Sequence, residues 1–206
     1  MNRRGLLIAF EGIDGTGKSS QLRMLAGYLR GRGCRVEQTR EPTESSYGKR
    51  IRKLYVDRGS CSPEEELELF IQDRKQHVRE LLEPRLADGW IVLTDRYYYS
   101  TAAYQGAAGL DADEIFRRNS FAPKPDRVIL LTMDPEISAT RIEQGRGENL
   151  NDFEQVDQLK KVAALFASFD DPCIRRIDAS QNIDAVQNQV RLEISALLEE
   201  KQFSCP

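Results

Sequence analysis

The sequence lacks several features that would point to particular kinds of protein. It has only one histidine among 206 residues, and no apolar run approaches the length of a membrane-spanning helix. Basic residues do not outnumber acidic ones, because 30 Lys and Arg stand against 33 Asp and Glu, for a formal net charge of −3. We therefore expect neither a membrane protein nor one that binds nucleic acid through bulk positive charge.

The cysteines are few and widely spaced. The four stand at positions 34, 61, 173 and 205, and His77 is the single histidine. This excludes a zinc site of the usual Cys/His spacing and leaves one way to build a Ser-His or Cys-His catalytic pair. The apolar run before Glu11 is only five residues long, too short for the core of a secretion signal. We therefore expect reduced thiols and a cytoplasmic protein.

Strand and helix patterns alternate along the whole chain. Short apolar runs predict strands at residues 6–10, 35–39, 90–94, 127–133 and 174–177. Apolar residues at helical spacing follow the first strand and recur from Ile183 to Leu197. Ser62 and Glu65 form a capping box before a further helix, which Pro84 is expected to interrupt. The alternation predicts a single α/β domain of 206 residues, with a parallel sheet of five strands covered by helices on both faces.

The connection after the first predicted strand has the pattern of a phosphate-binding loop. Residues 12–19 read Gly-Ile-Asp-Gly-Thr-Gly-Lys-Ser, which matches G-x-x-x-x-G-K-[ST] between a strand and a helix. In this motif backbone N–H groups and the helix N-terminus face phosphate oxygens, the lysine neutralises their charge and the serine ligates Mg²⁺. We expect a nucleoside triphosphate to contact Gly12, Gly15, Thr16, Gly17, Lys18, Ser19 and Ser20.

Other residues indicate which reaction the triphosphate undergoes. The sequence has no Asn-Lys pair, so the guanine-reading Asn-Lys-x-Asp motif of GTPases is missing. Asp95 is followed by Arg96, and Asp134 by Pro135, where switch and motor ATPases usually have an acidic residue that orients water. Transfer to an already ionised phosphate acceptor needs Mg²⁺ and arginines rather than a strong base. The pattern favours that transfer.

Four blocks of sequence resemble the thymidylate kinase family. They are FEGIDGTGKSSQ at 10–21, TREP at 39–42, LFIQDRKQH at 69–77 and DRYYYSTAAYQG at 95–106, with a weaker similarity at 125–148 and 177–187. The resemblance implies a P-loop kinase fold and a homodimer. It also implies transfer of the γ-phosphate of ATP to dTMP, giving dTDP and ADP in dTTP synthesis, with Mg²⁺ as cofactor. Two alternatives stay open: a kinase for another (deoxy)nucleotide or nucleoside, and a non-catalytic nucleotide-binding protein of the same fold.

The resemblance assigns roles around the phosphates. It implies that Asp14 accepts a hydrogen bond from the 3′-hydroxyl of dTMP and helps to organise Mg²⁺. Arg40 and Arg96 are implied to hold the dTMP phosphate, and Arg96 also to touch the transferred group. Asp95 is implied to complete the Mg²⁺ shell through water, together with Ser19. The alternatives are a tolerated loop residue at Asp14 and structural ion pairs for the arginines.

A second group is implied to recognise the nucleoside. Phe70 and Arg74 are four residues apart, hence on one helix face, and the resemblance implies that thymine stacks on Phe70 while Arg74 donates to its O4. An ordinary core position is the alternative for Phe70. Ser100 and Gln105 are implied to be polar partners of the base. Tyr104 is implied to pack where a ribose 2′-hydroxyl would clash.

Arg141 and Arg146 flank a polar, glycine-containing stretch without helical periodicity, from Gly145 to Asn151. That composition is typical of a mobile lid, expected at about 141–154, which closes over ATP and brings arginine to the transferring phosphate. Ser180 and Gln181, in the weaker block, are expected at the ATP site.

The sequence departs from the family at two places and carries one basic run. Residues 151–154, Asn-Asp-Phe-Glu, lack the arginine of the bacterial lid pattern Asp-Arg-x-Glu, and EPTESSYGK at 41–49 replaces the common Glu-Pro-Gly-Gly-Thr. The basic run at 49–53 is expected to be a solvated helix face. The tyrosines at 97–99 are expected to be packing residues.

Overall fold

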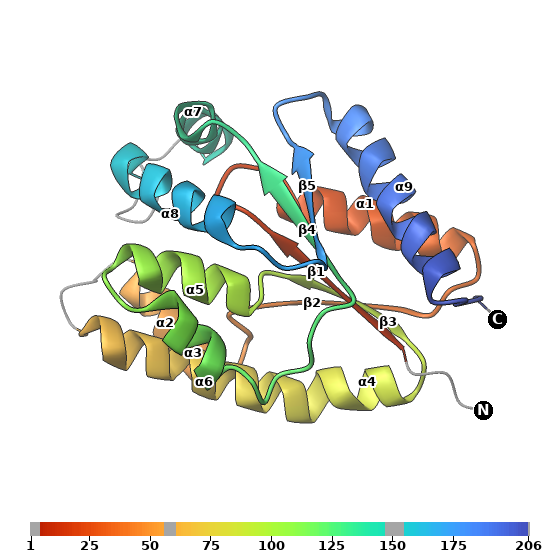
Figure 1. Cartoon of the computed structure of the whole chain (residues 1–206), viewed down its shortest axis with the longest axis horizontal. Coiled ribbons are helices and arrows are strands. Elements are labelled where there is room, and N and C mark those ends of the chain that lie inside the picture. The colour runs from red at the N-terminus through yellow and green to blue at the C-terminus, as the bar shows by residue number, and fades with distance from the viewer. Residues whose placement is uncertain (1–4, 56–60, 147–154, 206) are drawn as a thin grey trace.

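A computed structural model describes residues 5–55, 61–146 and 155–205. Five parallel strands form one sheet in the order β2-β3-β1-β4-β5 (Figure 1). The strands are β1 (Leu6–Glu11), β2 (Val36–Arg40), β3 (Ile91–Asp95), β4 (Arg127–Thr132) and β5 (Ile174–Asp178). All five predicted strands and the predicted parallel α/β sheet are confirmed. Central β1 is buried along its whole length, as the apolar run from Leu6 to Phe10 predicts for its first five residues.

Helices cover both faces of this sheet (Figure 1). Helices α1 (Lys18–Gly31) and α9 (Ile183–Glu200) pack on one face, where Ile8 and Phe10 of β1 belong to the core. Helices α3 (Pro63–His77), α5 (Tyr98–Ala107) and α8 (Val156–Ser168) pack on the other, where Leu7 and Ala9 point. Alternate side chains of one strand thus enter two separate cores, as the period of a strand requires.

Four further described helices complete the chain. They are α2 (Ser46–Leu54), α4 (Glu83–Ala87), α6 (Ala112–Arg118) and α7 (Pro135–Arg146). The capping box at Ser62 is present at the start of α3. The expected interruption is present too: a π-helical turn, η2 (Val78–Leu82), separates α3 from α4. Pro84 has no N–H to continue an α-helical ladder back to Glu80, which accounts for the change of geometry there.

The strand register sets the position of the functional loops. Phe10 and Arg40 are both paired with Asp95, so β1, β2 and β3 end side by side. The loops that follow these three strands therefore meet at one edge of the sheet, as in other open parallel sheets that bind ligands. No described helix is both long and apolar enough to cross a membrane.

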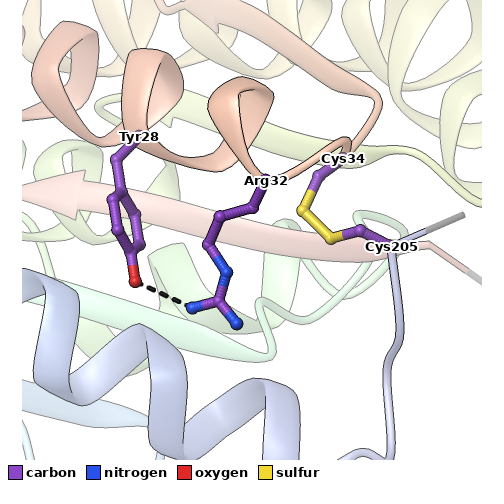
Figure 2. The surroundings of a disulfide bond; sticks show 4 residues. All are labelled: Tyr28, Arg32, Cys34 and Cys205. Atoms are coloured by element: carbon purple, nitrogen blue, oxygen red, sulfur yellow. Dashed lines mark hydrogen bonds between the residues drawn. A yellow bond between two sulfur atoms is a disulfide. The ribbon is translucent and has the colours of Figure 1, made fainter.

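The cysteines correct one expectation. Cys34, just after α1, and Cys205, beyond the end of α9, form a disulfide with their Cα atoms 4.5 Å apart (Figure 2). Cys61 and Cys173 are free. The expectation that all the thiols are reduced is therefore wrong for two of the four. The partners are 171 residues apart in sequence, and only the packing of α9 beside α1 brings them together.

Candidate active site

The phosphate loop has the backbone that its glycines predict. Gly12, Gly15 and Gly17 all have positive φ, at 131°, 80° and 87°. A Cβ on Gly15 would lie 2.6 Å from the carbonyl oxygen of Ser138, so the loop also packs too tightly there for a side chain. Helix α1 begins at Lys18 with no side chain capping its first turn. Its N-terminal N–H groups are therefore available to an anion.

Lys18 and Thr16 lie inside this loop and are both buried. The Lys18 ammonium donates to the Ile13 carbonyl at 2.7 Å, and the Thr16 hydroxyl donates to the same oxygen at 2.8 Å. Burial is the main reason that the pKa of Lys18 falls to about 8, and the positive charge of Arg96 acts in the same direction. Lys18 is thus still mostly protonated at neutral pH, and its charge is only weakly solvated.

Asp14, Arg96 and Tyr104 form a bonded cluster beside the loop. The Asp14 carboxylate accepts from Arg96 Nη2 at 2.6 Å and from the Tyr104 hydroxyl at 2.8 Å. Burial opposes ionisation of Asp14, but the charges of Arg96 and Lys18 outweigh it and hold the pKa of Asp14 well below its usual value. Asp14 is therefore a fixed anion between two cations.

Arg96 reaches this cluster through an unusual backbone. Its φ is 70°, a left-handed conformation that is uncommon for a residue with a side chain and concentrates at functional sites. Its N–H donates to the Phe10 carbonyl at 2.9 Å, and Thr94 Oγ1 donates to the Arg96 carbonyl at 2.8 Å. The guanidinium also donates to Ser100 Oγ at 2.8 Å. The strand ends thus hold Arg96 against the phosphate loop.

Glu11 is a site residue that the sequence analysis missed. It is fully buried and accepts from the backbone N–H groups of Tyr97 at 2.8 Å and Ser100 at 3.2 Å. The Ser100 hydroxyl also donates to the Glu11 carboxylate, and the Ser100 oxygen in turn accepts from Arg96. Burial raises the pKa of Glu11 to about 7. A carboxylate that ends an otherwise apolar strand was the available signal, but it was read only as the end of the run.

The two predicted metal ligands lie together. The Ser19 hydroxyl donates to the Asp95 carboxylate, at the junction of α1 and β3. The described residues contain no group of three or more His, Cys, Asp or Glu that would hold a metal ion. A hydroxyl and one carboxylate beside a phosphate loop fit Mg²⁺, which commonly takes few protein ligands and completes its shell with water and phosphate oxygens.

A cleft of about 460 Å³ joins these groups. It is lined by Asp14, Gly15, Gly17, Lys18, Ser19, Ser20, Arg40, Glu41, Pro42, Arg52, Tyr55, Asp95 and Arg96. The structure thus brings Arg40 and Arg96 into one cleft with the phosphate loop. The side chain of Arg40 is 63% exposed and pairs with Glu44, so it is the less constrained of the two.

Arg52 and Tyr55 in this cleft were not predicted. Arg52 donates to the carbonyls of Pro42 at 3.1 Å and Thr43 at 2.8 Å. The basic run at 49–53 is therefore not a uniformly solvated face, and that expectation is wrong at Arg52. Its neighbour Ile51 is buried and orients the helix, which turns Arg52 inward while Lys49, Arg50 and Lys53 face solvent.

The predicted base-recognition residues lie in different environments. Phe70 is half-buried, whereas Leu67 and Ile71 on the same helix are buried in the core. Both amide atoms of Gln105 are buried without a hydrogen-bond partner among the described residues. Such an amide is costly unless a ligand pairs with it. Ser100 is engaged by Glu11 and Arg96, so it lies at the phosphate side of the site.

Arg74 is also buried, 1% exposed, and mostly committed to protein partners. It donates to Glu41 through Nε and Nη2, to Thr101 through Nη2 and to Asn119 through Nη1. These contacts account for four of its five N–H groups, which leaves one on Nη1 for another acceptor.

The loop after β2, where the sequence departs from the family, has a defined anchor. Asp73 of α3 is buried and accepts from the Thr43 N–H at 2.8 Å and the Thr43 hydroxyl at 2.6 Å. The Ser45 hydroxyl donates to the same carboxylate, and Ser45 also caps α2. The Glu41–Pro42 peptide bond in this loop is cis. Serine and threonine therefore tie the loop to α3.

The structure describes some of the residues that are expected to bind ATP outside the phosphate loop. Arg141 of α7 donates to the carbonyls of Ala179 at 3.0 Å and Ser180 at 3.4 Å, so it lies at the connection between β5 and α9. Gln181 is in the same connection, where it accepts from Gln189. Arg146 is the last residue of α7. The rest of the expected lid, 147–154, including the departure at Asp152, lies outside the described residues.

Comparison with known proteins gives consistent matches. The sequence model of the family described as Thymidylate kinase matches residues 10–190. A thymidylate kinase of Desulfotalea psychrophila is 51% identical over 197 residues, which cover 96% of this chain and 98% of that protein. Thymidylate kinases of Xanthomonas euvesicatoria pv. vesicatoria and Xanthomonas campestris pv. campestris are 45% and 42% identical, and each match covers 96% of this chain and 86% of the relative.

Proposed function

The chain belongs to the thymidylate kinase family and phosphorylates dTMP in dTTP synthesis, and we propose that ATP and dTMP meet end to end in the cleft beside the phosphate loop. The observation that carries this proposal is the Asp14–Arg96–Tyr104 cluster against the loop. A protein that only bound or hydrolysed ATP would have no use for a second, arginine-lined anion site. A kinase for a nucleotide acceptor requires one.

On the donor side, the phosphate loop binds the ATP phosphates. Its N–H groups and Lys18 stabilise charge on the β- and γ-phosphates, where a weakly solvated ammonium acts strongly. Arg141, Ser180 and Gln181 take the nucleoside side of ATP, and a role of Arg146 toward the transferring phosphate is carried over from the family resemblance. Mg²⁺ held by Ser19 and Asp95 would supply further neutralisation of phosphate charge.

On the acceptor side, the guanidinium groups position the dTMP phosphate. Arg96, with Arg40 and Arg52 across the cleft, draws this phosphate toward the γ-phosphate of ATP. A dTMP phosphate oxygen forms the new bond to the γ-phosphorus while the bond to the β–γ bridging oxygen breaks. That acceptor oxygen is ionised at neutral pH, because the second pKa of a phosphate monoester is about 6. No general base is required.

The nucleoside is held by the groups deeper in the site. The Asp14 carboxylate accepts a hydrogen bond from the 3′-hydroxyl of dTMP. Tyr104 limits the space near the 2′ carbon of the sugar, where a ribose would carry a hydroxyl. Phe70 offers a half-exposed ring for stacking. The remaining Arg74 N–H and the unpaired Gln105 amide match a base that presents both carbonyl acceptors and an N–H donor, as thymine does.

We further propose Mg²⁺ dependence, a cytoplasmic location and a homodimer, the last from the family resemblance. Light scattering on the purified chain tests the dimer, because a monomer has a mass of 23.5 kDa and a dimer twice that. Activity after chelation and after Mg²⁺ is restored tests the metal.

The substrate assignment is tested with a panel of acceptors. dTMP, dUMP, dCMP, dGMP and thymidine are each supplied with MgATP, and ADP formation is measured. We expect dTMP to have the highest kcat/KM. Another preferred acceptor would replace the substrate assignment, and ATP binding without turnover on any acceptor would favour a non-catalytic protein.

A further inference from the structure

The single histidine is buried next to the candidate base site and has both ring nitrogens hydrogen-bonded. His77 is the last residue of α3 and is 5% exposed. Its Nε2 lies 2.7 Å from the Thr39 hydroxyl on edge strand β2, and its Nδ1 lies 2.9 Å from Glu41 Oε1. His77 contacts neither the phosphate loop nor Arg96 through any described hydrogen bond, so phosphate chemistry does not account for it.

The partners of His77 set its hydrogen-bond direction toward Glu41. A carboxylate can only accept, so Nδ1 must carry a proton and donate to Glu41. Although burial opposes its ionisation, Arg74 and His77 lower the pKa of Glu41, which is therefore an anion. Nε2 faces the Thr39 hydroxyl, which can act as either donor or acceptor, so the bond to Glu41 is the one that fixes a proton on Nδ1.

Glu41 divides its two oxygens between His77 and Arg74. Oε1 accepts from His77, while Oε2 accepts from both Nε and Nη2 of Arg74, the former at 2.9 Å. Asn119 holds Nη1, and the Arg74 guanidinium lies 5.4 Å from the centre of the Tyr97 ring. The plane of the guanidinium is therefore fixed, and so is the direction of its remaining N–H.

We propose that His77 is a positioning residue for base selection: it holds Glu41 so that Arg74 presents one N–H donor to a carbonyl oxygen of the pyrimidine. This inference rests on the proposed function, in which Arg74 faces the base. A 4-oxo pyrimidine such as thymine or uracil accepts that bond. Cytosine presents a 4-amino donor instead, which leaves both groups unpaired in a buried site.

Two substitutions separate this role from simple packing. The amide nitrogen of His77→Asn can replace Nδ1 and donate to Glu41, whereas that of His77→Gln replaces Nε2 and leaves Glu41 without its donor. Gln76→Ala, next to His77 but only half-buried and with its side chain bonded to Glu80, is the matched control. Each variant is assayed with dTMP and with dCMP at saturating MgATP.

His77→Gln should lower the dTMP-to-dCMP ratio of kcat/KM at least roughly tenfold, mainly through a higher KM for dTMP, since hydrogen bonds to charged groups are worth about 1.5–3 kcal/mol. The KM for ATP should stay within about twofold of the unaltered chain. His77→Asn and Gln76→Ala should keep the ratio. An unchanged ratio in His77→Gln, or an equal loss in His77→Asn, would overturn the proposal.

Two further measurements keep the result decisive. If His77→Gln does not fold, His77→Leu replaces it, because this apolar change removes the Nδ1 donor to Glu41; a ratio unchanged from the unaltered chain would then reject the role of His77. Turnover of dTMP by the unaltered chain is measured first. If the unaltered chain does not turn over dTMP, the proposed function is rejected. Normal turnover with a dTMP-to-dCMP ratio that the His77 substitution does not change would reject only the role of His77.

Discussion

Arg96 combines a left-handed backbone, an ion pair with Asp14 and a place in the cleft at the end of β3. The motif at 95–106 pointed to its role, but neither its φ nor its bond to Ser100 could be read from sequence. Ser100 was expected at the base, and only the fold shows that Glu11 and Arg96 engage its hydroxyl. A residue type indicates which bonds are available, whereas the partner depends on the packing of distant segments.

Arg96→Ala should reduce kcat by about 10³-fold or more, in the range that transition-state arginines contribute to phosphoryl transfer. The assay is steady-state turnover of dTMP with saturating MgATP. Arg50→Ala, an exposed arginine of α2, is the control and should be neutral. A rate near that of the unaltered chain would remove Arg96 from the site.

Glu11 should make stability depend on pH. Burial raises its pKa from 4.5 to about 7, so between these values the folded chain binds a proton that the unfolded chain has lost. Its contribution to the free energy of unfolding therefore falls as the pH rises through this window, by up to about 3 kcal/mol. In Glu11→Gln the free energy of unfolding should not show this pH-dependent decrease. Denaturant unfolding of both proteins at several pH values tests the prediction. Curves of unfolding free energy against pH that run parallel for the two proteins would contradict it.

At the scale of elements, local patterns were sufficient for the strands, the capping box of α3 and the interruption at Pro84. Each depends on residues close together in sequence. The loop after β2 is different, because Thr43 and Ser45 find their anchor in Asp73, some 30 residues later. The inward turn of Arg52 likewise depends on how α2 packs.

Asp73→Ala should release this loop. We expect a loss of about 2–3 kcal/mol in unfolding free energy, because three donors lose a buried carboxylate partner. The KM for dTMP should rise more than the KM for ATP, since the loop begins at Glu41, directly after Arg40 at the end of β2. Urea unfolding and steady-state kinetics measure both effects, with the exposed Glu199→Ala as control. Equal effects on both KM values would contradict a local role for the loop.

At the scale of the whole molecule, the order of strands and helices predicted the fold, but not the disulfide that joins the ends of α1 and α9 (Figure 2). Sequence spacing carries no information about two cysteines that meet only after both helices dock on the sheet. The disulfide also corrects the expectation of four reduced thiols.

Thiol titration tests the disulfide. The denatured, unreduced chain should show two reactive thiols, and four after reduction. Cys205→Ser should lower the unfolding free energy by about 2–4 kcal/mol, because the cross-link closes a long loop in the unfolded chain. Cys61→Ser, a free cysteine, should leave it unchanged. Four thiols before reduction and equal stability of both variants would contradict the bond.

The most direct test of the whole account follows the phosphoryl group itself. The chain is incubated with ATP labelled at the γ-phosphate, Mg²⁺ and dTMP, and the products are separated. We predict that the label appears in the β-phosphate of dTDP, with one ADP formed for each dTDP. Label released as inorganic phosphate, or retained in ATP while dTMP stays unchanged, would contradict it.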